Sequence, residues 1–174
     1  MISIKKYNKK LINQWNEFIQ LTNNGNLFHN QRFLNYHIDR SFMDGSLIFY
    51  KSNEMIALLP GVIQTINKKK VLCSHPGSSY GGVIVKQNLS FEAINSIIHA
   101  LDDFCIKNQF DSIILINVPT IYYNKYDESI NYLLLWNNYT IKEQYISHVV
   151  DLTVAQNVKS LLTKTLGSLD LGMD

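Results

Sequence analysis

The sequence predicts one mixed α/β domain in which a mixed sheet carries helices on both faces. The chain has 174 residues, of which 46% are hydrophobic and 17% charged. This length and balance are typical of a globular domain with one core rather than of a disordered chain. Apolar residues recur at helical spacing in four segments and form strand-like runs elsewhere. The predicted order is two helices, three strands, a loop with a short strand, then helix, strand, helix and strand.

The four helices are predicted from their apolar faces and from their first and last residues. Residues 22–25, Thr-Asn-Asn-Gly, stop the first helix, and Asn30 and Ser90 are suited to cap the second and third. Ile130, Leu133, Leu134 and Trp136 are the expected packing residues of the fourth. The predicted helices span residues 11–21, 30–37, 90–108 and 127–137.

Strands are predicted where β-branched and aromatic residues run between turn residues. Residues 51–54 suit a tight hairpin, and the basic run 68–70 suits a solvated hairpin tip. Pro60 marks a bulge, a bend or a point where its strand splays from its neighbour. The run at 111–117 predicts a central strand buried on both faces. The predicted strands span residues 47–50, 55–66, 71–73, 83–85, 111–117 and 141–152.

Composition excludes several classes of protein. The formal net charge is only +2, so neither DNA nor an anionic membrane is the expected partner. Cys73 and Cys105 match no metal-ligand spacing and are expected to be small core residues, and the histidines do not predict a zinc site. There is no signal peptide pattern and no apolar run long enough for a transmembrane segment. A cytoplasmic location is therefore expected.

The stretch 74–82 is the best candidate for a ligand surface. It combines one imidazole with hydroxyl groups and glycines that permit close approach to a ligand. The predicted substrate-binding residues of this loop are Ser74, His75, Tyr80, Gly81 and Gly82. The alternative is that proline and glycine only shape a tight connection while His75 satisfies a loop carbonyl.

Two further groups are weaker candidates. Tyr122 and Tyr123 follow the predicted strand at 111–117, at the end where open α/β sheets usually hold their ligands. They are predicted to bind substrate, although packing against the next helix explains them equally well. Arg40, Asp44 and Ser46 precede the first predicted strand and are expected to pair the helix end with the sheet rather than to bind a charged substrate.

A series of short motifs lies along most of the chain. They are Trp15, Asn24-Gly25, Phe28-His29, Asp44-x-Ser46, Leu58-Leu59-Pro60, Ser74-His75-Pro76, Tyr80-Gly81-Gly82 and Pro119-x-x-Tyr122. Their order and spacing resemble the N-terminal domain of bacterial FemAB-like acyltransferases, which have the GNAT (acyl-CoA N-acyltransferase) fold. The resemblance covers residues from about 1 to 152.

The resemblance implies a role in cell-wall or surface-polysaccharide assembly as one half of a tandem enzyme. A second GNAT-like domain would hold the donor, an acyl-CoA or an aminoacyl-tRNA, and a small-molecule or glycan-precursor acceptor would lie between the two. An acceptor amine would then attack the thioester or ester carbonyl. This half is expected not to catalyse alone and to hold no cofactor itself, because residues 86–90 lack the glycine with which GNAT domains cradle pyrophosphate.

The expected boundary separates a GNAT-like domain at 1–152 from the start of a connecting helix and a truncated tail at 153–174. The resemblance would continue into a second domain, so an acyltransferase is expected once that domain is present. Two alternatives stay open. One is a non-catalytic module that binds a glycan or a protein, and the other is a stand-alone acetyltransferase that forms a homodimer.

Overall fold

The computed structural model describes residues 1–36 and 42–145, and the chain divides into two compact units, residues 1–140 and 141–174. Residues 141–145 of the second unit are exposed, and there the Tyr145 hydroxyl donates a hydrogen bond to Glu143 Oε2 at 2.6 Å. No helix in the described ranges is both long and apolar enough to cross a membrane. The architecture below is that of the first unit.

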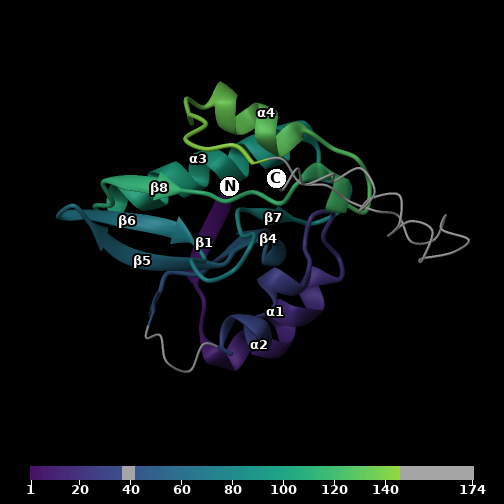
Figure 1. The fold of residues 1–174 in the computed structure, drawn as a ribbon. Coiled ribbons are helices and arrows are strands. Elements are labelled where there is room, and N and C mark those ends of the chain that lie inside the picture. Colours follow the sequence, from purple (N-terminus) through teal and green to yellow (C-terminus); the bar gives the residue numbers. More distant parts are fainter. Residues whose placement is uncertain (37–41, 146–174) are drawn as a thin grey trace, which may run out of the picture. The chain divides into compact units, whose positions relative to one another are not determined.

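The first unit contains two four-stranded sheets (Figure 1). In one sheet every neighbouring pair is antiparallel, and the order is β1 (Ile2–Lys6), β3 (Leu47–Lys51), β4 (Glu54–Leu59) and β7 (Ile84–Val85). The other is mixed because its last pair is parallel, and the order is β2 (Met43–Asp44), β5 (Gly61–Ile66), β6 (Lys69–Ser74) and β8 (Ser112–Ile114).

Pro60 separates the two sheets. The single strand predicted at 55–66 is in fact β4 followed by β5, which pair with different neighbours. Proline has no N–H to donate to a ladder, so a strand that contains it breaks or bends there. Ser46 Oγ accepts a hydrogen bond from Gly61 N at 3.1 Å and fixes the new direction. The bend predicted at Pro60 is confirmed.

Helices cover both faces of the strands, as predicted. The long helix α3 and the short α4 lie on one side, and α1 and α2 lie on the other (Figure 1). Their bounds are α1 (Ile12–Ile19), α2 (Gln31–Leu34), α3 (Phe91–Lys107) and α4 (Ser129–Trp136). The 3₁₀ helices are η1 (Lys9–Leu11), η2 (Leu27–His29) and η3 (Thr120–Tyr122).

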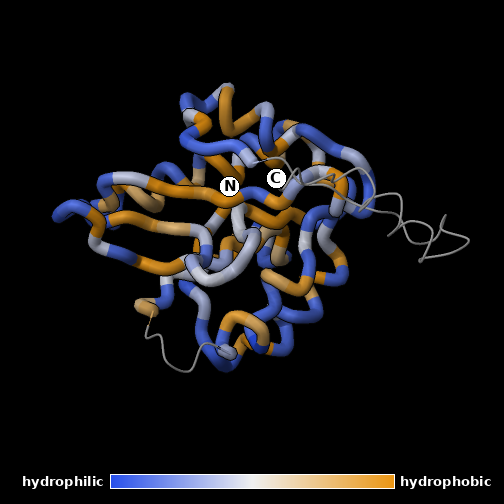
Figure 2. Tube along the Cα trace, viewed as in Figure 1, coloured by the Kyte–Doolittle hydropathy of each residue, from blue (hydrophilic) through white to orange (hydrophobic). Residues whose placement is uncertain are grey.

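The strand period of two sends alternate side chains into two cores. Phe49 belongs to the large cluster that α3 and α4 cover, whereas its neighbour Ile48 belongs to the smaller cluster around Trp15 of α1. Both side chains are fully buried. In Figure 2 the strands are largely hydrophobic and the hairpin turns between them hydrophilic. Cys73 and Cys105 are buried core residues, as expected.

Most helix caps and tight turns lie where the sequence predicts them. Ser90 Oγ accepts a hydrogen bond from Ala93 N at 3.2 Å at the start of α3, and Asn30 caps α2. The hairpin residues Ser52 and Asn53 both have positive φ angles, which the predicted tight turn requires. Asp44 Oδ1 accepts from Ser46 N at 2.8 Å, whereas Arg40 and His37 lie outside the described residues.

The prediction that two helices precede the sheet is wrong, because β1 comes first. Ile2 and Ile4 are half-buried against the large core, and β1 pairs along its whole length with β3. The alternation of isoleucine with exposed residues is the strand period itself.

The prediction of a central, fully buried strand at 111–117 is also wrong within the described residues. β8 is the edge of its sheet, and Ile113 and Ile114 are only half-buried. Trp136, predicted to pack, is 69% exposed. Residues 141–145 form no strand, while the rest of the predicted last strand and the boundary at 152 lie outside the described ranges.

Candidate functional site

The loop after β6 connects the two sheets, and we call it the excursion. β6 pairs with β5 up to Ser74, which lies opposite Gly61, and β7 resumes with Ile84 opposite Leu58. The intervening residues 75–83 have almost no ladder to join, because only Leu59 and Pro60 lie opposite them. They are therefore free to fold over the neighbouring segments.

This excursion is fastened to residues 115–117, which continue β8. Ser74 Oγ accepts a hydrogen bond from Ile116 N at 2.6 Å, and Gly81 N donates to Ile116 O at 2.8 Å. Gly82 lies against Asn117, so closely that a methyl group there would stand 2.5 Å from Asn117 Oδ1. We call this contact the seam. It closes the space between the end of β6 and the end of β8.

His29 holds the excursion from the other side. Its fully buried imidazole accepts a hydrogen bond from Asn26 N at Nδ1 (3.1 Å), so Nε2 carries the proton and donates to Gly81 O at 3.0 Å. Its own carbonyl accepts from Trp15 Nε1 at 2.8 Å. Burial lowers the pKa of His29, against the opposing effect of these backbone hydrogen bonds. The imidazole is thus a neutral clamp.

The buried His29 imidazole predicts that the free energy of unfolding falls at acid pH. The unfolded chain protonates this histidine near pH 6.5, whereas the folded protein does so only at lower pH because its pKa is lowered. The free energy of unfolding should therefore fall as pH drops below about 6.5, by at most about 1.4 kcal/mol per pH unit from this one proton. Urea unfolding at several pH values should show the wild type and His29→Ala converging toward acid pH. A gap that stays constant with pH would contradict this assignment.

An aromatic cluster forms the exposed surface of the excursion. The Tyr80 ring lies 5.4 Å from Phe28 and 5.7 Å from Tyr122, centroid to centroid. A hydrogen bond with Tyr80 raises the pKa of the Tyr122 hydroxyl, so the Tyr122 phenol is a neutral hydrogen-bonding group at neutral pH. Tyr122 is 43% exposed. The structure therefore brings together two of the predicted substrate-binding residues.

The other predicted residues lie elsewhere around the excursion. Ser74, Gly81 and Gly82 are buried in the seam. His75 is buried, with its ring 5.3 Å from that of Phe42. Tyr123 hydrogen-bonds to the Asn24 side chain, and burial raises the pKa of its hydroxyl to about 12. Substrate contact by these residues stays a prediction, and the contacts just described show what each does for the fold.

Sequence reasoning missed a buried polar segment at the end of α1. Thr22, Asn23 and Asn24 were interpreted as a helix stop, yet all three are buried and join β7 to the loop after η3. The Asn24 amide pairs with Val83 O and Val85 N, both at 2.9 Å. The Asn23 amide pairs in the same way with both backbone groups of Lys125. No local pattern reveals these partners, which lie 59 to 102 residues away.

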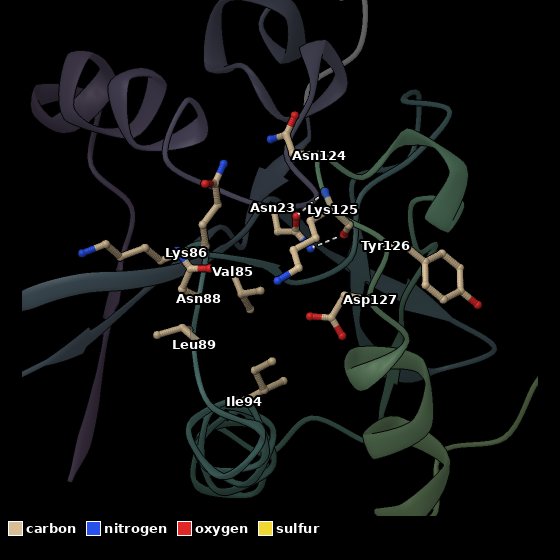
Figure 3. A pocket seen from close by; sticks show the side chains of 11 residues that line it. Asn23, Val85, Lys86, Asn88, Leu89, Ile94, Asn124, Lys125, Tyr126 and Asp127 are labelled. Carbon is tan, nitrogen blue, oxygen red and sulfur yellow. Dashed lines mark hydrogen bonds between the residues drawn. The ribbon is translucent and has the colours of Figure 1, made fainter. Parts of the chain in front are cut away.

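A groove of about 240 Å³ lies beside the start of α3, between residues 85–89 and 124–127 (Figure 3). We call it the helix-end groove. The side chains of Lys125 and Asp127 point toward this space, and Ile94 of α3 lies at its base. Lys86, which also lines it, is paired with Glu54. In the described ranges no group of histidine, cysteine and carboxylate residues could hold a metal ion.

The helix-end groove fits the pyrophosphate of an acyl-CoA poorly. The connection that leads to α3 has no glycine, and the only positive φ angle in it belongs to Asn88. Glu92 in the first turn of α3 and Asp127 across the groove would both repel a pyrophosphate. The backbone N–H of Ala93 already donates a hydrogen bond to Ser90 Oγ. These residues do not make the cradle that a CoA-binding GNAT domain would require.

Solved structures share this architecture at very low sequence identity. The aminoglycoside N-acetyltransferase AAC(6′)-Iy, in complex with a CoA-linked bisubstrate analogue, aligns with a TM-score of 0.51 and 12% identity over 87% of this chain and 99% of its own. The protein TTHA1254 from Thermus thermophilus has a TM-score of 0.50 and 9% identity over 85% and 96% of the two chains. The chain has the GNAT fold.

The comparisons go no further than the fold. A transcriptional regulator from Bacillus halodurans C-125 aligns as well, with a TM-score of 0.50 and 7% identity over 86% of this chain and all of its own. No family model and no curated protein matches the sequence. Because GNAT-fold proteins differ in what they bind, function must be argued from the residues of the site.

Proposed function

We propose that this chain is the acceptor-side domain of a FemAB-like N-acyl or aminoacyl transferase of cell-wall or surface-polysaccharide assembly. Its aromatic cluster would contact the acceptor, and a second GNAT-like domain would hold the donor. The seam is the observation that best supports this proposal. In the GNAT fold the strand after the crossover helix splays from its neighbour, whereas here both backbone groups of Ile116 are hydrogen-bonded, one to Ser74 and one to Gly81.

The seam is costly to open. Ser74 and Gly81 are buried, so separating them from Ile116 would leave polar groups without partners, each at a cost of about 1–3 kcal/mol. A donor would have to supply that energy before it gained any contact of its own. The Glu92 and Asp127 carboxylates add repulsion to any pyrophosphate at the same end of α3. A domain built this way is better suited to the acceptor.

The chemistry of this domain then lies in the Tyr80–Tyr122 pair. Each phenol can donate one hydrogen bond and accept another, and each ring offers an apolar edge or face. The cluster can therefore orient a polar acceptor. It does not supply a base that is ionised at neutral pH through Tyr122, because the hydrogen bond with Tyr80 raises the pKa of Tyr122 rather than lowering it.

A stand-alone acetyltransferase is the second candidate, and the extent of the structural match favours it. The chain aligns with 99% of AAC(6′)-Iy, an aminoglycoside N-acetyltransferase in complex with a CoA-linked analogue. That alternative requires acetyl-CoA to bind this chain directly.

Calorimetric titration with acetyl-CoA separates the two candidates. We expect the full chain to give no saturable heat with acetyl-CoA or CoA, with AAC(6′)-Iy titrated in parallel as the positive control. Saturable binding with one site per chain would overturn the acceptor-side proposal and favour the stand-alone enzyme. A non-catalytic module shares the negative result but predicts no acyl transfer when the second domain is supplied.

A further inference from the structure

A second groove is lined by five residues with side-chain amides and by three residues without one. Its volume is about 540 Å³, and it shares Gln87 and Asn124 with the helix-end groove. None of its lining residues is charged, and the remaining ones are Ile19, Gln20, Gly25, Asn26, Leu27 and Asn30. We call it the amide groove.

Three of its amides are held in fixed orientations. Asn26 Oδ1 accepts from Phe28 N at 3.0 Å and Asn30 Oδ1 accepts from Arg32 N at 2.8 Å, so each side chain caps a helix with its oxygen. Asn124 Nδ2 donates to Thr22 O at 2.8 Å. The other half of each amide makes no hydrogen bond within the described part of the chain. The groove thus presents two amide nitrogens and one carbonyl oxygen without partners among the described residues.

Two glutamines add adjustable groups. The Gln20 side chain is exposed and makes no hydrogen bond to any described residue, although its backbone closes α1. Gln87 is also exposed, and its Nε2 reaches Thr22 O only at 3.3 Å. Both amides can therefore turn toward a ligand at little cost to the fold.

The chemistry of the lining selects the class of ligand. A charged ligand would find no counter-charge among these residues, and an apolar one would leave the amides without partners. A ligand with many hydroxyl groups satisfies both halves of each amide. Leu27, which is 62% exposed, adds an apolar surface for C–H groups.

Two residues of the amide groove are close in sequence to residues of the aromatic cluster. Leu27 precedes Phe28 in η2, and Asn124 lies two residues after Tyr122. Rings beside amides suit a molecule with polar edges and apolar faces. The volume also lies within the usual range for small-molecule sites. We infer that the amide groove binds a neutral saccharide.

This inference deepens the proposed function, because the saccharide would be the recognised part of the acceptor. Only the role of the saccharide as part of the acceptor rests on the proposed function. Binding itself depends on the groove alone and can be measured without any donor.

The test is a heteronuclear NMR titration of the full chain, which reports side-chain amide groups directly. The probes are β-1,4-linked tri-N-acetylglucosamine and maltotriose, with a tri-galacturonate as the charged comparison. We expect saturable shifts of the Asn and Gln side-chain signals of the groove with at least one neutral probe, and weaker binding of the charged one. Gln20→Ala and Gln87→Ala should each weaken binding about fivefold, the effect of one lost hydrogen bond.

Gln14→Ala is the matched control, because Gln14 is an exposed glutamine near the start of α1 that does not line the groove. It should leave the affinity unchanged. The inference is overturned if neither neutral probe shifts the groove amides, or if Gln14→Ala weakens binding as much as Gln20→Ala does. Saccharide binding together with tight CoA binding would keep this inference and remove the acceptor-side proposal. No saccharide and no CoA binding would do the reverse.

Discussion

Replacing Gly82 by alanine should lower the free energy of unfolding by about 2–3 kcal/mol. Gly82 has a φ angle of +75°, which costs an alanine about 1–2 kcal/mol by itself. The new methyl group would also stand 2.5 Å from Asn117 Oδ1 and 3.3 Å from Asn117 Cα. Asn117 has little room to retreat, because its Nδ2 donates to Asn131 Oδ1 at 3.1 Å. Urea unfolding followed by tryptophan fluorescence measures the loss.

The same substitution in an Asn117→Ala background separates the two causes. Removing Oδ1 relieves the steric part, so Gly82→Ala should then cost only about 1–2 kcal/mol, the conformational part. An equal cost in both backgrounds would mean that Gly82 is needed for its φ angle alone. A cost below about 0.5 kcal/mol in both would show that the seam is not closed as described.

Replacing His29 by alanine should lower the free energy of unfolding at pH 7.5 by about 2–4 kcal/mol. The imidazole is fully buried, so its loss leaves a cavity. It also leaves Gly81 O without its donor, in a part of the chain where Gly81 is buried. The excursion would then keep the seam, the Asn24–Val83 hydrogen bond and the Phe28–Tyr80 contact, but it would lose this clamp.

His99→Ala is the control for this prediction, because His99 is an exposed histidine in the middle of α3. It should change the free energy of unfolding by less than about 0.5 kcal/mol. Amide hydrogen exchange adds a local measurement. In His29→Ala the amide of Gly81 should exchange faster, whereas amides in the middle of α3 should change only with global stability. Unchanged protection at Gly81 would show that His29 does not hold the excursion.

Much of the fold follows from local physical chemistry that the sequence displays. A serine whose oxygen caps a helix acts within four residues, so Ser90 could be recognised as the start of α3. Pro60 interrupts a ladder wherever it stands, and Ser52-Asn53 turns a hairpin because both residues tolerate positive φ. The order of these elements predicted a mixed sheet with helices on both faces, and the resemblance of the short motifs implied the GNAT fold.

Position within the sheet could not be predicted in the same way. The apolar run after α3 has the composition of a buried strand, yet β8 is an edge with half-buried isoleucines. The composition of a strand shows whether its side chains can be buried. Their actual burial depends on which strands and helices lie beside that strand. Trp136 shows the same limit, since its apolar character predicted packing and the tertiary structure leaves it exposed.

The candidate site was predicted only in part, for a reason of distance along the chain. Tyr80 and Tyr122 were recognised from turn-rich segments at strand ends, and folding does bring their rings together. The seam, the His29 clamp and the amide groove each join segments tens of residues apart. In the sequence, a side-chain amide or imidazole gives the same signal whether it faces water, a buried carbonyl or a ligand in the folded protein. Its partner exists only once the chain has folded, and that partner decides its role.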